Sequence, residues 1–394
     1  MAAKTIADLD LQGRRVFICV DFNVPLTPAG GVSDATRIRE SLPTINHAIE
    51  RGARVVLASH LGRPKGHPRP ELSLLPVAAF LAEALGRDVF LTDEPAGDGA
   101  KKVVNDLRDG SVAMLENLRF APGEEANDEA FARNLASYAD VYVNEAFSTA
   151  HRSHASTAGM VKYISSKGLG FHADRDVKML GKLVGEVERP FVAIVGGTRV
   201  SEKIGLLENL LGRADAVCLG GAMANTFLAA KGVPMGRSLV EPSKLPIARA
   251  FLAKAESIGA HIVLPRDLVV AEHDKAETGA VIAASTVPDN HGVFDIGPES
   301  AAEIGNVLAR ARTVFWNGPM GVSESPAFAA GTMSVAKSLA LVMGGTTVVV
   351  GGDTAAAVQR AGVASSITHI STGGSASLEF IEGKKLPGLA ALES

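Results

Sequence analysis

Cysteine, aromatic residues and excess charge are all scarce in this chain of 394 residues. Its two cysteines, Cys19 and Cys218, show neither CxxC nor zinc spacing, which argues against a disulfide framework and favours a reducing compartment. A formal net charge of −4 provides no global basic field, so general binding of nucleic acid or of a membrane surface is not expected. The first ten residues carry charge and have no apolar signal-peptide core, and the apolar stretch 338–352 is too short to span a bilayer. We therefore expect a cytoplasmic protein without a membrane segment.

Several familiar catalytic motifs are absent as well. The sequence has no GxxxxGK[ST], which argues against a P-loop fold, and no GxSxG, which argues against acyl-enzyme chemistry. His151 and His154 have the i,i+3 spacing of metal ligands, but no nearby Cys or third His completes a zinc site. Residues 168–173 read GLGFHA and match GxGxxA, yet they follow a weak strand pattern. A nicotinamide-dependent dehydrogenase is therefore the weakest alternative.

Short apolar runs separated by amphipathic stretches dominate what is present. Their near-continuous apolarity is typical of parallel strands covered on both faces. A chain of this length exceeds the usual size of one hydrophobic core, so the pattern predicts an α/β protein of two doubly wound, Rossmann-like parallel-sheet domains. The expected strands lie in 16–22, 53–60, 141–147, 191–197, 216–221, 313–318 and 346–352.

A helical pattern marks the expected boundary between the domains. Apolar residues recur at helical spacing between 174 and 187, and Pro190 prevents the helix from continuing. Gly181 and Gly185 within it either soften a hinge or allow close helix packing, and the pattern does not decide between these. We expect a first domain over 1–173 with the C-terminal tail of about 380–394, a connecting helix over 174–187, and a second domain over 188–379.

The expected strands of the first half end in charged and amide side chains. In open α/β sheets ligands bind beyond the carboxyl ends of the strands, so these side chains should share one edge. Arginine's planar fork suits carboxylate and phosphate, which points to a small, multiply charged acid. Asp21 and Asn23 are suited to bind its hydroxyl groups. The cationic candidates are Arg37, His60, Arg63, Arg119, His151 and Arg152.

The expected strands of the second half end instead in paired glycines. Glycine lets the backbone approach a phosphate, and the N–H groups at a helix start favour negative charge. Asp353 supplies a hard oxygen ligand suited to Mg²⁺ beside phosphate, and Lys203 lies a helical turn beyond its loop. The loops are GGTR (196–199), GGAM (220–223), NGPMG (317–321), GGDT (351–354) and TGG (372–374).

Seven motifs, in order and at family spacing, resemble phosphoglycerate kinase. They are VDFNVP (20–25), SHLGRP (59–64), LENLRF (115–120), TAHRSHAST (149–157), WNGPMGV (316–322), GGDT (351–354) and HISTGG (369–374). The resemblance extends from about Val16 to the tail GKKLPGLAAL (383–392).

This resemblance implies reversible transfer of a phosphoryl group between ATP and the carboxylate of 3-phosphoglycerate, giving ADP and 1,3-bisphosphoglycerate, in glycolysis. It implies a monomer that uses Mg²⁺, closes about a hinge, and returns its C-terminal end to the first domain. The positions matching phosphoglycerate-binding residues are Asp21, Phe22, Asn23, Arg37, His60, Leu61, Gly62, Arg63, Arg119 and Arg152. Those matching nucleotide positions are Gly196, Lys203, Gly220, Gly221, Asn317, Pro319, Glu324, Gly351, Gly352, Asp353 and Thr354, with Asp353 near the metal. The positions implied to act on the transferred group are Arg37, Arg199, Lys203, Gly373 and Gly374.

A few positions depart from the family pattern. Cys19 stands where arginine is usual, Arg199 replaces a lysine, Ser323 replaces a common phenylalanine, and Ser375 replaces a third glycine. Loss of one preorganised donor lowers the rate of an enzyme by about 10²–10³. The alternative function is therefore a catalytically weakened, kinase-derived protein that binds nucleotide or sugar acid.

Overall fold

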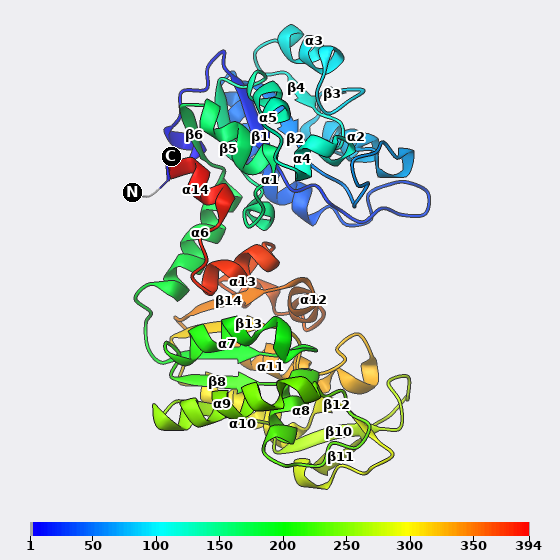
Figure 1. Ribbon diagram of the computed structural model, residues 1–394, viewed down its shortest axis with the longest axis vertical. Coiled ribbons are helices and arrows are strands. Elements are labelled where there is room, and N and C mark those ends of the chain that lie inside the picture. The colour runs from blue at the N-terminus through cyan, green and yellow to red at the C-terminus, as the bar shows by residue number, and fades with distance from the viewer. Residues whose placement is uncertain (1–2, 394) are drawn as a thin grey trace. The chain divides into compact units, whose positions relative to one another are not determined.

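The computed structural model describes residues 3–393, which form two compact units (Figure 1). The first unit comprises the chain up to Lys178 together with the segment from Lys384 onward, and the second runs from Met179 to Gly383. Within the described residues no helix is long and apolar enough to cross a membrane.

The first unit is built on a parallel sheet of six strands in the order β3-β4-β2-β1-β5-β6. Its central strands are buried along almost their whole length, as the near-continuous apolar runs predict. The strands are β1 (Arg15–Cys19), β2 (Arg54–Ala58), β3 (Val89–Leu91), β4 (Val112–Met114), β5 (Val141–Asn144) and β6 (Ser166–Leu169).

Helices pack against this sheet through apolar stripes. In α1 (Thr36–Glu50) the buried residues Ile38, Ile45 and Ile49 recur at helical spacing and join the core of the sheet. The other helices are α2 (Leu75–Leu85), α3 (Asp98–Asp106), α4 (Pro122–Glu125), α5 (Glu129–Ala136) and α14 (Pro387–Glu393). Short 3-10 turns are η1 (Ile6–Asp8), η2 (Pro70–Leu72), η3 (Leu118–Phe120), η4 (Phe147–Thr149) and η6 (Met160–Tyr163), and η5 (Ala155–Gly159) is a π-helical turn.

The helix expected over 174–187 is α6 (Phe171–Val184), which begins one turn earlier than the apolar pattern indicates. Its first N–H groups have acceptors from elsewhere in the first unit. Phe171 N donates to Thr44 Oγ1 at 2.8 Å, and Ala173 N donates to the buried Glu145 Oε2 at 3.1 Å. These side chains satisfy the free donors of the first turn, so the helix starts at Phe171.

The second unit also contains a parallel sheet of six strands, in the order β15-β14-β13-β7-β8-β9. These strands are β7 (Phe191–Val195), β8 (Ala216–Leu219), β9 (His261–Val263), β13 (Thr313–Asn317), β14 (Thr346–Val350) and β15 (His369–Ser371). The expected fold class, two doubly wound parallel-sheet domains, is confirmed. An antiparallel sheet in the order β11-β10-β12, which the sequence patterns did not indicate, adjoins it: β10 (Asp267–Ala271), β11 (Ala280–Ala283) and β12 (Gly292–Ile296).

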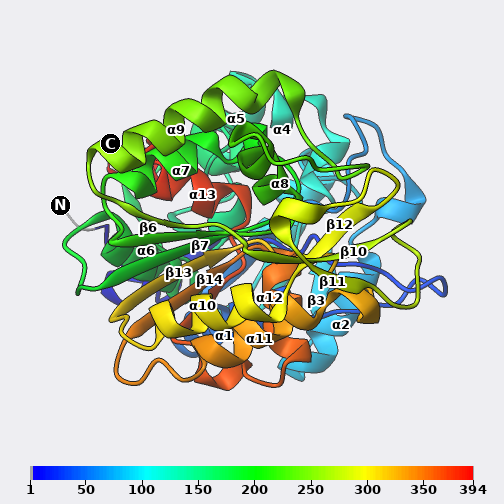
Figure 2. The same ribbon diagram turned by 90° about the horizontal axis from the view of Figure 1, so that it is seen from below.

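Helices cover both faces of the parallel sheet in the second unit, with α7, α8, α9 and α13 on one side and α10, α11 and α12 on the other (Figure 2). Trp316, on the central strand β13, is completely buried in the core between these layers. The helices are α7 (Ile204–Leu211), α8 (Gly221–Ala230), α9 (Leu245–Ser257), α10 (Pro298–Leu308), α11 (Ala330–Leu339), α12 (Gly352–Arg360) and α13 (Ser375–Ile381). The 3-10 turns are η7 (Val200–Glu202), η8 (Pro242–Lys244), η9 (Ala284–Thr286), η10 (Pro326–Phe328) and η11 (Ala364–Ser366).

Candidate functional site

In the first unit, charged and amide side chains meet beyond the ends of β1 and β2. Asp21, the second residue after β1, accepts hydrogen bonds from Arg37 of α1 and from Ser148 Oγ. The backbone N–H of Asn23 also donates to Asp21 Oδ1, at 3.1 Å. Phe22 between them is completely buried, and its N–H donates to Ser59 Oγ at 2.9 Å. The loop after β1 is therefore held by side-chain contacts.

The loop after β2 is tied to the same cluster through Gly62. Gly62 N donates to Asn23 Oδ1, and Arg119 Nη1 donates to Gly62 O, each at 2.9 Å. Gly62 has a φ of +62°, which a side chain would strain. Leu61 is buried and Arg63 is exposed. The structure thus brings Asp21, Asn23 and Gly62 of the two loops together with Arg119.

Electrostatics in this cluster keep an anionic Asp21 beside a neutral His60. Burial lowers the pKa of His60 to about 4, and the positive charges of Arg119 and Arg37 also lower it. The imidazole is therefore neutral near pH 7. Burial alone would raise the pKa of Asp21, but Arg37 and the hydrogen bonds from Ser148 and Asn23 outweigh it, and the pKa lies below its ordinary value. Since His60 is neutral, Arg37 is the cation that keeps Asp21 ionised.

Arg119 and Arg152 bring two further positive charges to this region. Burial lowers the pKa of the Arg119 guanidinium; Glu125 opposes that shift, whereas the charge of Arg152 adds to it. Arg152 itself is partly exposed, as is His151. Two neighbouring arginines that repel each other are suited to an anion that would relieve the repulsion.

In the second unit the corresponding strand ends are joined by backbone hydrogen bonds between glycine loops. Gly196 N donates to Asn317 O at 2.9 Å, and Gly221 N donates to Met320 O at 2.8 Å. Met223 N, in the first turn of α8, donates to Gly197 O at 3.0 Å. The loops after β7, β8 and β13 therefore form one bonded layer.

Glycine is required where these loops touch. A Cβ at Gly196 would lie 2.1 Å from Pro319 O, and one at Gly221 would lie 2.5 Å from Gly197 O. Gly221 also has a φ of +66°. Gly220 is less strictly confined, since its Cβ would lie 2.4 Å from Sδ of the flexible Met320 side chain. The paired glycines in these loops are thus a consequence of close backbone approach rather than turn punctuation alone.

The ammonium group of Lys203, which the sequence predicts to lie near the phosphates, contacts the glycine loops. Its Nζ donates to Gly196 O at 2.6 Å and lies 3.3 Å from Asn317 O. Burial lowers its pKa to about 8, and the charges of Glu202 and Asp353 oppose that shift. The ammonium is therefore mostly protonated at neutral pH and loses its charge as the pH rises through about 8.

The loops after β14 and β15 complete this edge of the sheet. Asn317 Nδ2 donates to Val350 O at 2.8 Å, and Gly318 N donates to Thr354 Oγ1 at 2.7 Å, which ties the GGDT loop to the NGPMG loop. Asp353 is exposed in the first turn of α12, preceded by Gly351 and Gly352. Gly373 is buried, and Gly374, with a φ of +54°, precedes α13.

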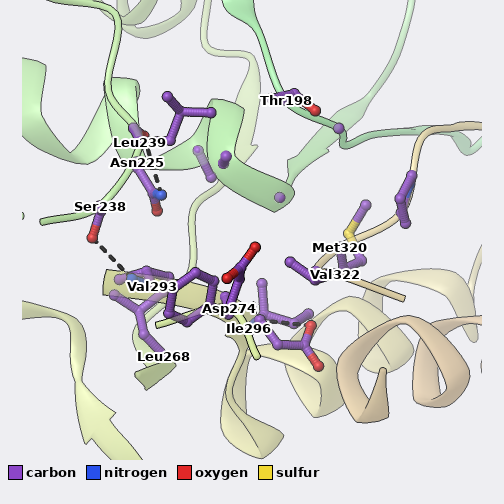
Figure 3. A pocket seen from close by; sticks show the side chains of 18 of the residues that line it. Thr198, Asn225, Ser238, Leu239, Leu268, Asp274, Val293, Ile296, Met320 and Val322 are labelled. Atoms are coloured by element: carbon purple, nitrogen blue, oxygen red, sulfur yellow. Dashed lines mark hydrogen bonds between the residues drawn. The ribbon is translucent and has the colours of Figure 1, made fainter. Parts of the chain in front are cut away.

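A cavity of about 290 Å³ lies beside these loops (Figure 3). Its wall includes several predicted residues: Gly221, Pro319, Glu324 and Asp353. Sequence reasoning missed the rest of the lining, which comes from α8, the loop after it and the antiparallel sheet. It includes the apolar and polar residues Asn225, Ser238, Leu239, Leu268, Phe294 and Ile296 and the charged residues Arg237, Asp274 and Asp295. Asn225 Nδ2 donates to Leu239 O at 3.3 Å, and Val293 N donates to Ser238 Oγ at 3.0 Å. Such a lining suits a flat, apolar ligand group next to a phosphate-binding edge.

The departures from the family pattern occupy contrasting environments. Cys19 is buried at the end of β1, and burial raises the pKa of its thiol to about 12, so the position is uncharged. Arg199 is exposed, with its Nη1 3.3 Å from Glu202 Oε1. Ser375 begins α13. Ser323 is buried and its carbonyl oxygen accepts a hydrogen bond from Arg360 Nη2 at 3.2 Å.

The protein has two doubly wound domains. One carries an arginine-rich cluster at its strand ends, and the other carries a layer of glycine loops beside a cavity. This combination is that of a phosphotransferase. The family model described as "Phosphoglycerate kinase" matches residues 6–384. Phosphoglycerate kinases from Anaeromyxobacter dehalogenans (strain 2CP-C) and Moorella thermoacetica are 56% and 52% identical to the chain, over its whole length and 100% and 99% of theirs. The chain belongs to the phosphoglycerate kinase family.

Solved structures agree with this placement. The phosphoglycerate kinase from Coxiella burnetii superposes with a TM-score of 0.91 at 38% identity, covering 99% of each chain. The enzyme from Pyrococcus horikoshii OT3 superposes with a TM-score of 0.85 at 32% identity, covering 100% of this chain and 98% of the other. The chain is accordingly a phosphotransferase with a carboxyl group as acceptor, and its substrates are 3-phosphoglycerate and ATP.

Proposed function

We propose that the strand-end cluster of the first unit binds 3-phosphoglycerate. The observation that carries this assignment is the joined set of Asp21, Asn23, Gly62 and Arg119, with Arg37 on Asp21. Arg119, Arg152 and Arg63 are the cations suited to the phosphate and carboxylate, and Asp21 and Asn23 accept hydrogen bonds from the hydroxyl.

We propose that the glycine-loop layer of the second unit binds the nucleotide. The cavity lined by Leu239, Leu268 and Phe294 accommodates the base, and Glu324 at its wall accepts hydrogen bonds from the sugar. The phosphates lie along the N-terminus of α12, where the backbone N–H groups of the first turn and the ammonium of Lys203 balance their negative charge.

Asp353 fits a magnesium ion bound to the nucleotide. Its carboxylate is exposed at the start of α12, and Mg²⁺ is commonly held by one or two carboxylates plus substrate phosphates. When bound there, the ion would neutralise charge on the phosphate oxygens.

We further propose that the protein acts as a cytoplasmic monomer.

The chemistry requires positioning rather than a base. A substrate carboxylate is already ionised at neutral pH, so it can attack the γ-phosphate directly and in line. Arg37, Arg199, Lys203 and the N–H groups at Gly373 and Gly374 are the groups proposed to stabilise the phosphoryl group in flight. Because the acid and nucleotide sites belong to different units, transfer requires domain closure, for which α6 is the proposed hinge.

Separate titrations of the two substrates test this assignment. We expect Arg152→Ala to weaken 3-phosphoglycerate binding about tenfold or more with ATP binding unchanged, and Lys203→Met to lower kcat by about 10²–10³ with 3-phosphoglycerate binding unchanged. The matched controls are Arg108→Ala and Lys231→Met, which remove exposed cations elsewhere in the same units. Calorimetry on each variant gives the affinities. An Arg152 variant with unaltered acid affinity would contradict the first assignment.

A further inference from the structure

A buried carboxyl group that no part of the proposed function uses lies beneath the arginines of the first unit. Glu124 is the third residue of the short helix α4 and is only 3% exposed. Its Oε1 accepts a hydrogen bond from Ser156 Oγ at 2.6 Å, and its Oε2 accepts one from Ser156 N at 3.1 Å. His154 Nδ1 lies 3.8 Å from Oε1. Burying an acid costs free energy, and these contacts offset part of that cost.

On one side, these contacts fix the turn that follows Arg152. Ser156 O accepts a hydrogen bond from Tyr142 Oη at 2.9 Å, so Ser156 is held from two directions. The next residue, Thr157, donates from Oγ1 to Arg152 O at 2.9 Å and accepts from His154 N at 3.1 Å. The backbone of Arg152 is thereby connected to Glu124 through two consecutive residues.

On the other side, Glu124 is joined to Arg119 by a short and constrained stretch of chain. Arg119 lies in η3, and α4 follows after Ala121. Pro122 at the first position of α4 fixes its backbone, and Glu124 N donates to Ala121 O at 3.2 Å. The carboxyl of Glu124 therefore connects the segment 118–125, which carries Arg119, to the segment 151–157, which carries Arg152.

We infer that Glu124 is a positioning residue for the acid substrate: its carboxyl group holds the loop of Arg152 at a fixed distance from Arg119. The like charges of Arg119 and Arg152 disfavour their close approach, and the contacts of Glu124 hold the two backbone segments together against it. Glu124 does so from within the core, where no substrate atom has to contact it. This inference rests on the proposed assignment of Arg119 and Arg152 to 3-phosphoglycerate.

The charge of Glu124 gives the inference a second, independent readout. Burial raises its pKa to about 7, against the hydrogen bonds from Ser156 and the charge of Arg119. Around it are Glu125 of α4, His154 and Ser156 of the segment 151–157, and the neutral Cys19 and Tyr142 of β1 and β5. Burial lowers the pKa of His154 to about 4, so this histidine is uncharged near neutrality. Above about pH 7 Glu124 therefore adds a negative charge next to the site for an anionic substrate.

Two substitutions separate the contacts from the charge. Glu124→Ala removes both hydrogen bonds to Ser156, and we expect the KM for 3-phosphoglycerate to rise about tenfold while the KM for ATP changes less than about twofold. Glu124→Gln keeps a donor for Ser156 Oγ and an acceptor for Ser156 N but cannot ionise. Its KM for the acid should match the wild type at about pH 6 and fall below it at about pH 8. The substrate phosphate titrates near pH 6 in both proteins, so the ratio of the two KM values is the measured quantity.

Further variants control for folding and for surface charge. Ser156→Ala removes one of the two hydrogen bonds with a smaller change in volume, and a rise of about two- to fivefold in the KM for the acid is expected. Glu129→Gln alters an exposed carboxylate on α5 and should leave both KM values unchanged. Circular dichroism and thermal unfolding establish that each variant is folded.

The outcomes are distinguishable. If Glu124→Ala does not fold, the result for Ser156→Ala decides, because an unchanged KM for the acid there overturns the inference. Equal changes in both KM values, or lower stability with unchanged KM values, also overturn it. A Glu124→Gln ratio that stays constant between about pH 6 and about pH 8 refutes the charge effect. If Arg152→Ala itself leaves acid binding unchanged, the proposed function fails rather than the role of Glu124.

Discussion

The two units share an architecture of six parallel strands but end those strands with different chemical groups. In the first unit the ends carry side chains that make the hydrogen bonds: Asp21 bonds to Arg37, and Asn23 and Arg119 both bond to the backbone of Gly62. In the second, the backbone of one glycine loop bonds to the backbone of the next. A sugar acid presents a carboxylate, a hydroxyl and a phosphate in a fixed order, which side chains can distinguish. Nucleotide phosphates form a uniform row of oxygens, for which repeated N–H groups suffice.

This difference determines which kind of substitution each site tolerates least. Side chains bring charge into the protein, so the first site depends on buried ionisable groups such as Asp21, His60 and Glu124. Backbone loops need only space, so the second depends on the absence of a Cβ at positions such as Gly196 and Gly221. We expect electrostatic perturbation to affect the first site more and steric perturbation to affect the second more.

Among the substitutions that test this contrast between the units, adding one methyl group at Gly221 should produce the largest effect. In Gly221→Ala the Cβ would lie 2.5 Å from Gly197 O and 2.6 Å from Gly197 N, and the residue would have to keep a φ of +66°. Since all of the nearest atoms are backbone, the loops after β7 and β8 must separate. We expect the KM for ATP to rise at least about tenfold, with binding of 3-phosphoglycerate to the variant unchanged in calorimetry.

Gly212→Ala is the matched control for this change. Gly212 follows α7 with a φ of −82°, and its nearest neighbour is 4.0 Å from the added Cβ. This variant should be as active as the wild type and equally or more stable, by up to about 1 kcal/mol. If Gly221→Ala bound ATP as well as Gly212→Ala does, close backbone approach would not explain the glycine loops.

The sequence predicts the parallel strands because a continuous apolar run such as 191–195 is typical of a strand covered on both faces. It does not predict the antiparallel sheet. There β11 is almost entirely exposed and β10 almost entirely buried, so neither shows the alternation that marks a half-buried strand. Likewise α6 starts at Phe171 because Thr44 and Glu145, remote in sequence, supply its caps. The local sequence pattern cannot predict such contacts between residues that are far apart in the sequence.

The candidate site divides in the same way. Residues next to strand ends, such as Asp21 or Asp353, can be found because parallel strands end at a common edge. Asn225, Leu239 and Leu268 lie elsewhere in the sequence, and apolar residues that line a cavity have the same composition as those of a core. Glu124 was missed for a different reason. The run PGEE reads as an exposed helix start, and only the fold shows that its first glutamate is buried.

Buried acids should make the stability of the protein depend on pH, and Glu145 of the first unit is one of them. Burial raises the pKa of Glu145 to about 7, against its hydrogen bonds from Thr44 and Ala173. Between an unfolded value near 4.5 and about 7 the folded state binds more protons than the unfolded state, so the unfolding free energy decreases as the pH rises through this window. Glu145→Gln should reduce this decrease by up to about 3 kcal/mol between about pH 5 and about pH 7.5, measured by urea unfolding.

The exposed Glu129 provides the opposite case in the same unit. Hydrogen bonds from Arg133 and Tyr163 hold its pKa below the ordinary value, so its contribution is present at neutral pH and is lost as the pH falls. Glu129→Gln should therefore leave the window between about pH 5 and about pH 7.5 unchanged. A Glu145→Gln variant with the wild-type dependence on pH would mean that the carboxyl ionises normally despite its burial.

Replacing Arg199 by lysine, the residue that the resemblance implies at this position, should have the smallest effect, because the arginine is not built into the bonded layer of the second unit. Its side chain is 62% exposed and contacts Glu202 at 3.3 Å, a surface ion pair of the kind worth at most about 1 kcal/mol. Arg199→Lys keeps the positive charge, so we expect the unfolding free energy to change by less than about 0.5 kcal/mol and kcat by less than about tenfold. A coupled assay of ATP consumption that depends on 3-phosphoglycerate measures the rate, and Glu202→Gln controls for loss of the ion pair.

A gain of orders of magnitude in kcat on restoring lysine would show instead that the guanidinium is a poor substitute at the transferred phosphoryl group. The backbone layer would then depend on one particular side chain, and the contrast between the two units would be weaker than their loops indicate.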